Sequence, residues 1–105
     1  MRDSGTVTFQ AVDGIDWIEA ADYYAKLHVA DKVELVRYTM NELERQLDPR
    51  RFVRVHRSAI VNVLRVKEIR LDYQNHHVIV LRSGTRVPLS RSRKDILEEV
   101  LSRAV

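Results

Sequence analysis

The sequence predicts a mostly β fold of short antiparallel strands with two short helices, one mid-chain and one C-terminal. Short runs in which apolar and polar residues alternate recur along most of the chain, as in strands that bury one face. Only residues 40–47 and 96–101 space their apolar residues as one face of a helix does. Strands and helices do not alternate along the chain, and this order excludes a doubly wound parallel sheet.

Four strands are expected in the first part of the chain, over residues 7–12, 15–19, 23–29 and 33–38. Asp13-Gly14 is a hairpin turn signal between the first two strands. Residues 20–22 are expected to connect the second strand to the third, which is rich in aromatic and β-branched residues. Asp31-Lys32 then turns the chain into the fourth strand.

A short helix is expected after the fourth strand. Thr39 and Glu42 have the spacing of a capping box, in which each side chain bonds the backbone N–H of the other residue. The apolar face of this helix consists of Met40, Leu43 and Leu47. Asp48-Pro49 ends the helix.

The second half returns to alternation, with strands expected over residues 52–55, 66–71, 77–81 and 85–89. Residues 57–62 mix polar and apolar side chains and are interpreted as a loop or a turn of helix. Residues 73–76 and Ser83-Gly84 are expected to be turns between strands. Ser90 is placed to N-cap the C-terminal helix.

Length and composition indicate one domain. The chain has 105 residues, enough to bury a core, and its lack of cysteine excludes a disulfide scaffold, a zinc ribbon and a thiol nucleophile. Residues 1–6 are expected to be disordered or a cloning remnant, and residues 7–105 to form the domain. No apolar stretch is long enough for a membrane span and no signal peptide is visible. We therefore expect a cytoplasmic location without membrane contact.

Charge is distributed unevenly along the chain. Residues 1–49 hold five Lys and Arg against ten Asp and Glu, whereas residues 50–105 hold thirteen against five. Fourteen of the eighteen cations are Arg, whose planar fork of donors suits phosphates and guanine edges. A basic half of this kind indicates a polyanion as partner, with a merely solvated surface as the alternative.

The strongest candidate site lies where the strand over residues 52–55 ends in a connection, since loops after rigid strands usually carry binding residues. Cations and hydrogen-bonding side chains gather there, namely Arg54, His56, Arg57, Ser58 and Asn62. The arginines can reach phosphates or base edges, while the serine and the asparagine can bind phosphates or hold the loop. His56 is interpreted as a structural histidine in preference to a direct DNA contact.

A second candidate site is Ser90-Arg91-Ser92-Arg93-Lys94, at the start of the C-terminal helix. Cations oppose the helix dipole there and cost about 0.3–1 kcal/mol each. Their presence favours a use such as phosphate binding, with solvated arginines as the alternative. A third candidate, residues 19–26, supplies two tyrosines and Lys26 near a turn. Alternation is expected to bury one tyrosine and to leave the other with Lys26 facing a ligand.

Signals for catalysis are weak. No serine lies in a G-x-S-x-G motif, and glycines at positions 5, 14 and 84 alone exclude a Gly-rich phosphate loop. His76-His77 lies beside a turn without partners at metal-ligand spacing. We expect no enzyme, and no catalytic residue, metal or cofactor.

Three separated motifs resemble the LytTR family, the DNA-binding output domain of many bacterial response regulators. They are IDWIEAADYYAKLHV (residues 15–29), LDPRRFVRVHRSAIVNVLRVKEI (residues 47–69) and GTRVPLSRSRKDIL (residues 84–97). The family hallmark is a Phe-x-Arg-x-His-Arg-Ser run, an aliphatic-Val-Asn and a late Ser-Arg, all present here in order. The resemblance covers about residues 7–103.

The resemblance implies an elongated antiparallel β fold whose loops, from one edge, enter successive major grooves of double-stranded DNA. The base-reading loops would be residues 22–26 and those centred on Arg57 and Arg91. In the first loop, Ala25 reaches at most a thymine methyl, so Tyr24 or Lys26 would carry any polar readout. The other matched residues would be phosphate contacts or loop supports, namely Arg54, His56, Ser58, Asn62, Ser90, Arg93 and Lys94.

The resemblance also implies how such a domain is used. Family members place it after a receiver domain whose phosphoacceptor Asp regulates dimerisation on tandem repeats, or beside membrane or sensor segments. We therefore expect a bacterial transcription regulator of two-component type that binds promoter direct repeats as a dimer, and whether a receiver precedes it stays open. Two alternatives remain: a small β-rich protein-interaction module that uses the acidic first half, and a single-stranded RNA binder, for which seven aromatics are few.

Overall fold

The computed structural model describes residues 9–104. Its helices are α1 (Phe9–Gly14), α2 (Met40–Gln46) and α3 (Lys94–Ala104), with 3-10 turns η1 (Val63–Arg65) and η2 (Arg91–Arg93). Its strands are β1 (Trp17–Ala21), β2 (Tyr24–Val29), β3 (Lys32–Val36), β4 (Phe52–His56), β5 (Ala59–Asn62), β6 (Val66–Leu71), β7 (His77–Leu81) and β8 (Arg86–Pro88). The expected disordered start over residues 1–6 lies outside the described residues.

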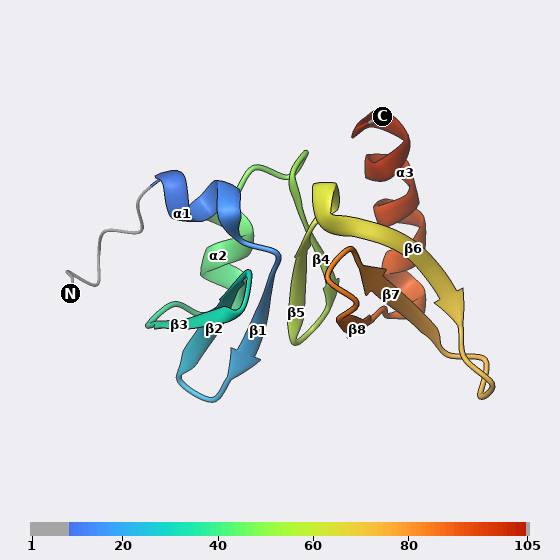
Figure 1. The fold of residues 1–105 in the computed structure, drawn as a ribbon, viewed down its shortest axis with the longest axis horizontal. Coiled ribbons are helices and arrows are strands. Elements are labelled where there is room, and N and C mark those ends of the chain that lie inside the picture. Colours follow the sequence, from blue (N-terminus) through green and yellow to red (C-terminus); the bar gives the residue numbers. More distant parts are fainter. Residues whose placement is uncertain (1–8, 105) are drawn as a thin grey trace.

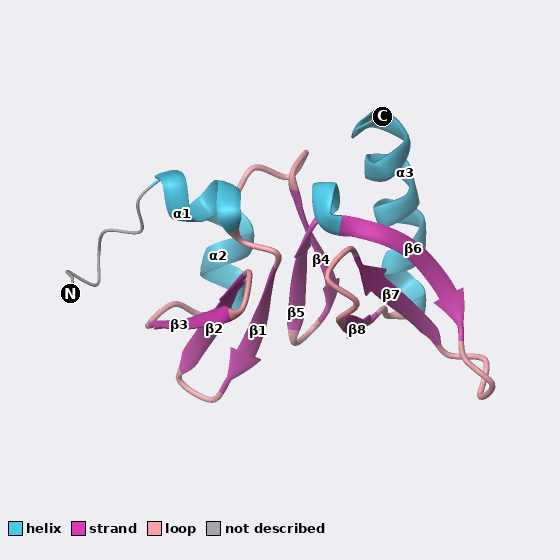
Figure 2. Ribbon diagram, in the orientation of Figure 1, coloured by secondary structure: helices cyan, strands magenta, loops and turns pink. Residues whose placement is uncertain are grey.

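The strands form two antiparallel sheets, which Figures 1 and 2 show along the long axis of the molecule. The five-stranded sheet has the order β3-β2-β1-β5-β4, and the three-stranded sheet has the order β6-β7-β8. The molecule is elongated, with principal extents of 42 × 29 × 24 Å. The prediction of a mostly β, antiparallel fold with few helices is confirmed.

Strand alternation divides the core into two clusters. One face of the five-stranded sheet, with Ile18, Leu27 and Ile60, packs against α1 and α2. The opposite face contributes Trp17 and Val61 to a second cluster, which the three-stranded sheet and α3 complete. Strand β5 lies between both clusters and is buried at all four positions. The turn that precedes β5 is therefore attached to the most rigid part of the molecule.

The expected strand over residues 7–12 is wrong from Phe9 onward, and residues 7 and 8 lie outside the described part. Phe9–Gly14 is a helix, and Asp13-Gly14 ends it instead of turning a hairpin. Residues three apart, such as Phe9 and Val12, share one face of a helix but would face opposite sides of a strand. Val12 packs against the cluster on the α2 side, and this tertiary contact decides for the helix.

The interpretation of residues 57–62 as a loop or helical turn is also wrong. Only Arg57 and Ser58 form a turn, and Ala59–Asn62 is the strand that pairs with both β1 and β4. A strand buried on both faces shows no polar-apolar alternation, so its periodicity cannot distinguish it from a helix or loop. The expected connection over residues 20–22 is likewise shorter, since Ala20 and Ala21 belong to β1.

The two predicted helices are confirmed. At α2, the Thr39 hydroxyl accepts from the Glu42 N–H at 3.0 Å, and the Glu42 carboxylate accepts from the Thr39 N–H at 2.8 Å. The bond from the Thr39 N–H, together with the Thr39 side chain, holds the pKa of the Glu42 carboxyl below its ordinary value. The C-terminal helix differs in detail, because a 3-10 turn precedes it. Ser90 occupies the N-cap position of that turn, but its side chain makes no capping hydrogen bond.

Candidate nucleic-acid interface

The three predicted loops lie along one edge of the molecule. The β1–β2 turn, the β4–β5 turn and the connection from β8 to η2 all point to the lower side of Figure 1. Antiparallel hairpins explain this arrangement, since alternate turns of neighbouring strands fall at the same sheet edge. The edge therefore presents segments from positions near 22, 57 and 91 of the sequence.

Backbone hydrogen bonds join the three loops to one another. The Ala20 N–H donates to the Ser58 carbonyl at 2.9 Å and thereby ties the β1–β2 hairpin to the β4–β5 turn. The pairing of β4 with β5 shifts between Arg54 and His56, which leaves Val55 as the extra residue of a β-bulge. The Val55 carbonyl accepts from the Ser90 N–H at 2.8 Å, so the bulge anchors the β8–η2 connection.

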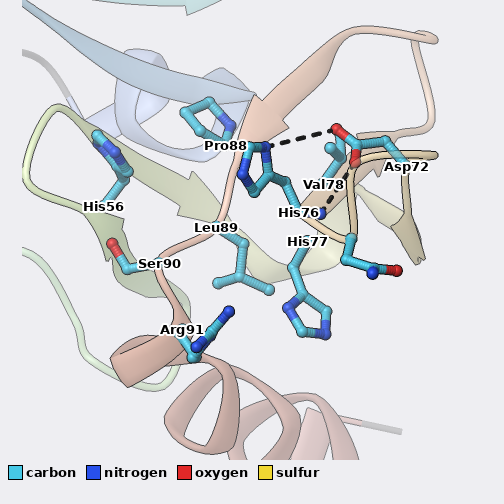
Figure 3. A pocket seen from close by; sticks show the side chains of 10 residues that line it. His56, Asp72, His76, His77, Val78, Pro88, Leu89, Ser90 and Arg91 are labelled. Atoms are coloured by element: carbon cyan, nitrogen blue, oxygen red, sulfur yellow. Dashed lines mark hydrogen bonds and ion pairs between the residues drawn. The ribbon is translucent and has the colours of Figure 1, made fainter.

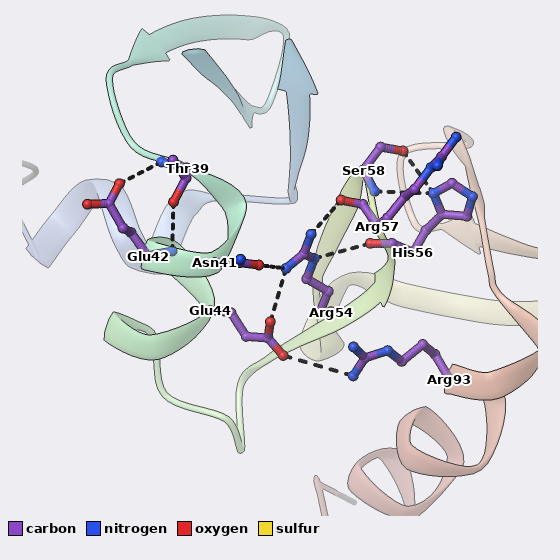
Figure 4. A network of polar contacts seen from close by, with 9 residues as sticks. All are labelled: Thr39, Asn41, Glu42, Glu44, Arg54, His56, Arg57, Ser58 and Arg93. Atoms are coloured by element: carbon purple, nitrogen blue, oxygen red, sulfur yellow. Dashed lines mark hydrogen bonds and ion pairs between the residues drawn. The ribbon is translucent and has the colours of Figure 1, made fainter. Parts of the chain in front are cut away.

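Arg54 holds the β4–β5 turn from the α2 side (Figure 4). Its guanidinium donates to the Arg57 carbonyl at 2.6 Å and to the His56 carbonyl at 3.4 Å. It also donates to the Asn41 side chain at 2.6 Å and to the Glu44 carboxylate at 3.1 Å. With 12% of its side chain exposed, Arg54 is committed to these contacts. Of the two roles considered for it, loop support fits this geometry.

His56 and Ser58 close the same turn from inside. The Ser58 N–H donates to His56 Nδ1 at 3.2 Å, and the Ser58 hydroxyl lies 2.9 Å from that nitrogen. Because a backbone N–H donates to Nδ1, the neutral imidazole carries its proton on Nε2. The geometry matches the structural histidine that the sequence favours.

Asn62 lies far inside the molecule, with 1% of its surface exposed. Its amide donates to the Ile15 carbonyl at 2.8 Å and accepts from the Leu64 N–H at 3.1 Å. These bonds satisfy the only buried polar residue of the described core. Burial leaves no route to a phosphate, so the supporting role is the one that fits.

Arg57 and Arg91 are the cations that the edge leaves free. Both are exposed, and neither side chain makes an ion pair or hydrogen bond with the described residues. In contrast, Arg93 lies 3.9 Å from the Glu44 carboxylate and Lys94 lies 3.0 Å from Glu98. A 3-10 helix turns about 120° per residue, so Arg91 and Arg93 face different directions.

The first loop differs from its prediction. Ala25 is fully buried and cannot touch a base, and Lys26 is half-buried within β2. Neither tyrosine is in the core, since Tyr23 is 90% exposed and Tyr24 is 37% exposed. The prediction that one of the two tyrosines is buried is therefore wrong.

Two residues of this region were not chosen as base contacts, although Tyr23 lies within the loop predicted over residues 22–26. Tyr23 follows Asp22, whose φ of 52° makes the tight turn, and it stands at the tip of the hairpin. Arg37 stacks over the Tyr24 ring at 5.5 Å and donates to its hydroxyl at 3.4 Å. The turn-forming Asp22-Tyr23 pair between two alternating runs was a usable signal, whereas the distant Arg37 contact was not.

Three carboxylates of the acidic first half form ion pairs with arginines of the basic second half. Carboxylates from before residue 49 pair with arginines from after it, as Asp13–Arg51 at 2.9 Å, Asp16–Arg65 at 3.4 Å and Glu44–Arg54 at 3.1 Å. Part of the charge asymmetry along the sequence is thus compensated by intramolecular ion pairs between the two halves. The three pairs involve only Asp13, Asp16 and Glu44 among the acidic residues before position 49.

Comparison with known proteins decides the family. The model of the LytTr DNA-binding domain family matches residues 5–102. The chain belongs to the LytTR family of DNA-binding domains. This LytTR domain is 32% identical over 99 residues to the CO-responsive transcriptional regulator RcoM of Rhodospirillum rubrum, which covers 92% of the chain and 42% of RcoM. It is 30% identical over 92 residues to the sensory transduction protein LytT of Bacillus subtilis, covering 86% of the chain and 38% of LytT.

A solved LytTr DNA-binding domain from Bacillus cereus has the same fold. It superposes with a TM-score of 0.75 at 29% identity, covering 85% of this chain and 82% of the other. The chain spans about two fifths of the curated relatives it matches. The LytTR family is a DNA-binding family of transcription regulation and not an enzyme family.

Residues 9–104 of the LytTR domain contain neither a metal-binding cluster nor a membrane-spanning helix. No group of three or more His, Cys, Asp or Glu side chains in this part is arranged to hold a metal ion. None of its helices has the length and apolar character needed to cross a bilayer.

Proposed function

We propose that this LytTR domain binds double-stranded DNA sequence-specifically through the three joined loops. The observation that carries the proposal is the single edge on which the β1–β2, β4–β5 and β8–η2 segments are bonded to one another. The edge presents Arg57 and Arg91 without intramolecular partners. An arginine free at a loop tip can donate two hydrogen bonds to a guanine edge.

The dimensions of the domain suit successive major grooves. One turn of B-DNA spans about 34–36 Å. The long axis of the domain is 42 Å, so loops spaced along it can reach neighbouring grooves on one face of the duplex. The β4–β5 turn lies between the other two loops and presents Arg57 to the bases.

Each proposed site residue has one role in this arrangement. The proposed base contacts are Arg57, Arg91 and, from the first loop, Tyr24 or Lys26. The proposed phosphate contacts are Ser58, Ser90, Arg93 and Lys94, and the loop supports are Arg54, His56 and Asn62. Supports of this kind fix the loops before DNA arrives, which lowers the conformational cost of binding.

We further propose that the domain acts in a bacterial transcription regulator that binds promoter direct repeats as a dimer. Its curated relatives are a CO-responsive transcriptional regulator and sensory transduction proteins, each more than twice the length of the matched segment. A receiver or sensor domain in the full-length protein, in a two-component pathway in the cytoplasm, fits these relatives.

Salt dependence tests the DNA proposal. If about four to six phosphates are neutralised, the logarithm of the association constant should fall with the logarithm of salt concentration with a slope near −4 to −5. Fluorescence anisotropy with a labelled duplex at several salt concentrations measures this slope. A slope shallower than −1 on every duplex would contradict DNA binding.

A further inference from the structure

A carboxylate on α2 lies between two of the three loops (Figure 4). One oxygen of Glu44 accepts from the Arg54 guanidinium at 3.1 Å, and the other lies 3.9 Å from the Arg93 guanidinium. Arg54 holds the β4–β5 turn, and Arg93 belongs to η2. The side chain of Glu44 therefore links the second and the third of the proposed DNA-binding loops.

The two contacts of Glu44 differ in strength. The contact with Arg54 is a hydrogen bond, and that arginine is 12% exposed and donates to the Asn41 side chain and the Arg57 carbonyl as well. The 3.9 Å contact with Arg93 is too long for a hydrogen bond, and the two side chains are 39% and 41% exposed. Water screens an exposed ion pair of this kind, so the pair contributes little to stability. Arg93 can therefore exchange the carboxylate for another anion, whereas Arg54 stays in place.

The other arginine of η2 lies away from Glu44. Arg91 lines a cavity of about 500 Å³ between the β8–η2 connection and the β6–β7 hairpin (Figure 3). Asp72 lines the same cavity, where its carboxylate lies 3.9 Å from His76, and Arg91 forms no ion pair with the described residues. Of the two arginines of η2, Glu44 thus contacts Arg93 alone.

We propose that Glu44 is a positioning residue that supports the β4–β5 turn through Arg54 and competes with DNA phosphate for Arg93. The proposal rests on the DNA-binding function proposed above, in which Arg93 contacts a phosphate, and it adds the group that Arg93 leaves when DNA binds. A guanidinium binds carboxylate and phosphate oxygens with the same fork of donors, so the two anions compete for it. The charge of Glu44 also repels the approaching DNA backbone. Glu44 therefore lowers the affinity for every duplex while it stabilises the turn that presents Arg57.

Two substitutions of Glu44 separate the two effects. Glu44→Gln keeps an oxygen that can accept from Arg54 but removes the charge beside Arg93, whereas Glu44→Ala removes both. Each variant is titrated at several salt concentrations with a duplex selected by the wild-type domain and with a scrambled duplex. We expect Glu44→Gln to bind both duplexes about two- to fivefold more tightly, the range of an exposed ion pair. Its salt slope should steepen by up to about 0.9, the contribution of one neutralised phosphate.

Glu44→Ala should show the same steeper salt slope and, in addition, a loss of sequence preference. Without the bond from Glu44 to Arg54, the β4–β5 turn holds Arg57 less firmly. The ratio of selected to scrambled affinity should therefore fall by about fivefold, the worth of one typical hydrogen bond. In Glu44→Gln this ratio should stay at the wild-type value.

Two further variants locate the effect. Glu42→Gln removes the same charge from the same helix, but the Glu42 carboxylate bonds the Thr39 N–H and contacts neither loop arginine. Its affinities and salt slope at neutral pH should match those of the wild type. In an Arg93→Ala background, Glu44→Gln should no longer tighten binding. Melting curves establish that each variant is folded.

The outcomes separate this proposal from the DNA-binding proposal. Wild-type affinity of Glu44→Gln, or a gain that persists in the Arg93→Ala background or appears equally in Glu42→Gln, overturns the competition for Arg93. An unchanged ratio of selected to scrambled affinity in Glu44→Ala overturns the support of the turn. Each of these results leaves DNA binding by the wild-type domain intact. A wild-type domain that shows no salt-dependent binding to either duplex overturns the DNA proposal itself.

Discussion

Arg54 and Arg57 lie three positions apart and have opposite environments. The Arg54 guanidinium donates to two carbonyls of the turn and to side chains of α2, whereas Arg57 is left without a partner among the described residues. From the residues of the strand and its connection, Arg54 and Arg57 were equally able to reach phosphates or base edges. Only the packing of α2 against the turn separates their roles, and no local pattern encodes that contact.

Arg57→Ala should weaken binding to the selected duplex by about 1–3 kcal/mol and relax the preference at one base position. The free energy of unfolding should not change, since the Arg57 side chain makes no intramolecular bond. Binding titrations on the selected duplex and its single-base variants measure the effect. Arg50→Ala is the matched control, because Arg50 is an exposed arginine at the opposite end of β4. Equal affinity of folded Arg57→Ala and wild type would refute the base contact.

His56→Ala should lower both stability and DNA affinity, because the Ser58 N–H loses its acceptor. The bond is part-buried, so its loss should cost about 1 kcal/mol. In His56→Asn, the side-chain oxygen can take the place of Nδ1 and should restore most of the stability. Thermal melts beside binding curves separate the cases. If His56→Ala melts like wild type and only its affinity falls, the histidine reads DNA directly.

Arg91→Ala should change which sequence is preferred, by about 1–3 kcal/mol at one position. Arg93→Ala should weaken all duplexes alike and lower the salt slope by about one unit. The Arg93 guanidinium lies 3.9 Å from the Glu44 carboxylate, and this contact holds the Arg93 side chain toward α2. Both variants are compared on selected and scrambled duplexes at two salt concentrations. The assignment is reversed if Arg93→Ala alters the preference and Arg91→Ala acts uniformly.

At the scale of elements, local chemistry predicted the helix at residue 40 and missed strand β5. The capping box at Thr39 and Glu42 is a short-range signal, and it forms as the spacing requires. Strand β5 is buried on both faces, so its character depends on neighbours on either side. The prediction for residues 9–12 was wrong because it also depended on a tertiary contact. Val12 packs against the cluster on the α2 side.

The capping box also sets a pH dependence. The Thr39 N–H donates to the Glu42 carboxylate and, with the Thr39 side chain, stabilises its ionised form, so the folded-state pKa of Glu42 lies below the unfolded value near 4.5. This stabilisation is present above the unfolded pKa and is lost as the pH falls through the folded pKa. Glu42→Gln keeps a hydrogen-bonding side chain without the charge. Melting temperatures between pH 7 and 3 should fall less steeply for Glu42→Gln than for wild type, and parallel curves would argue against the carboxylate.

For the whole molecule, the family and the basic edge could be predicted from the sequence, whereas the hydrogen bonds between the loops could not. The motifs around residues 22, 57 and 91 located the three loops in the sequence. The bonds that join them run between backbone groups, from Ala20 to Ser58 and from Ser90 to Val55. Nearly every residue has the same backbone donor and acceptor, so the sequence does not indicate which of these groups bond one loop to another. The three ion pairs between the acidic and the basic half likewise required the fold.

The central claim is that one edge of joined loops faces DNA, and hydroxyl-radical footprinting on a duplex selected from a random library tests it most directly. A single domain should protect the duplex on one face, in patches separated by about one helical turn of 10–10.5 base pairs. In Arg57→Ala and Arg91→Ala, different patches should weaken. Selection that enriches no sequence, or protection spread evenly around the duplex, would contradict the account.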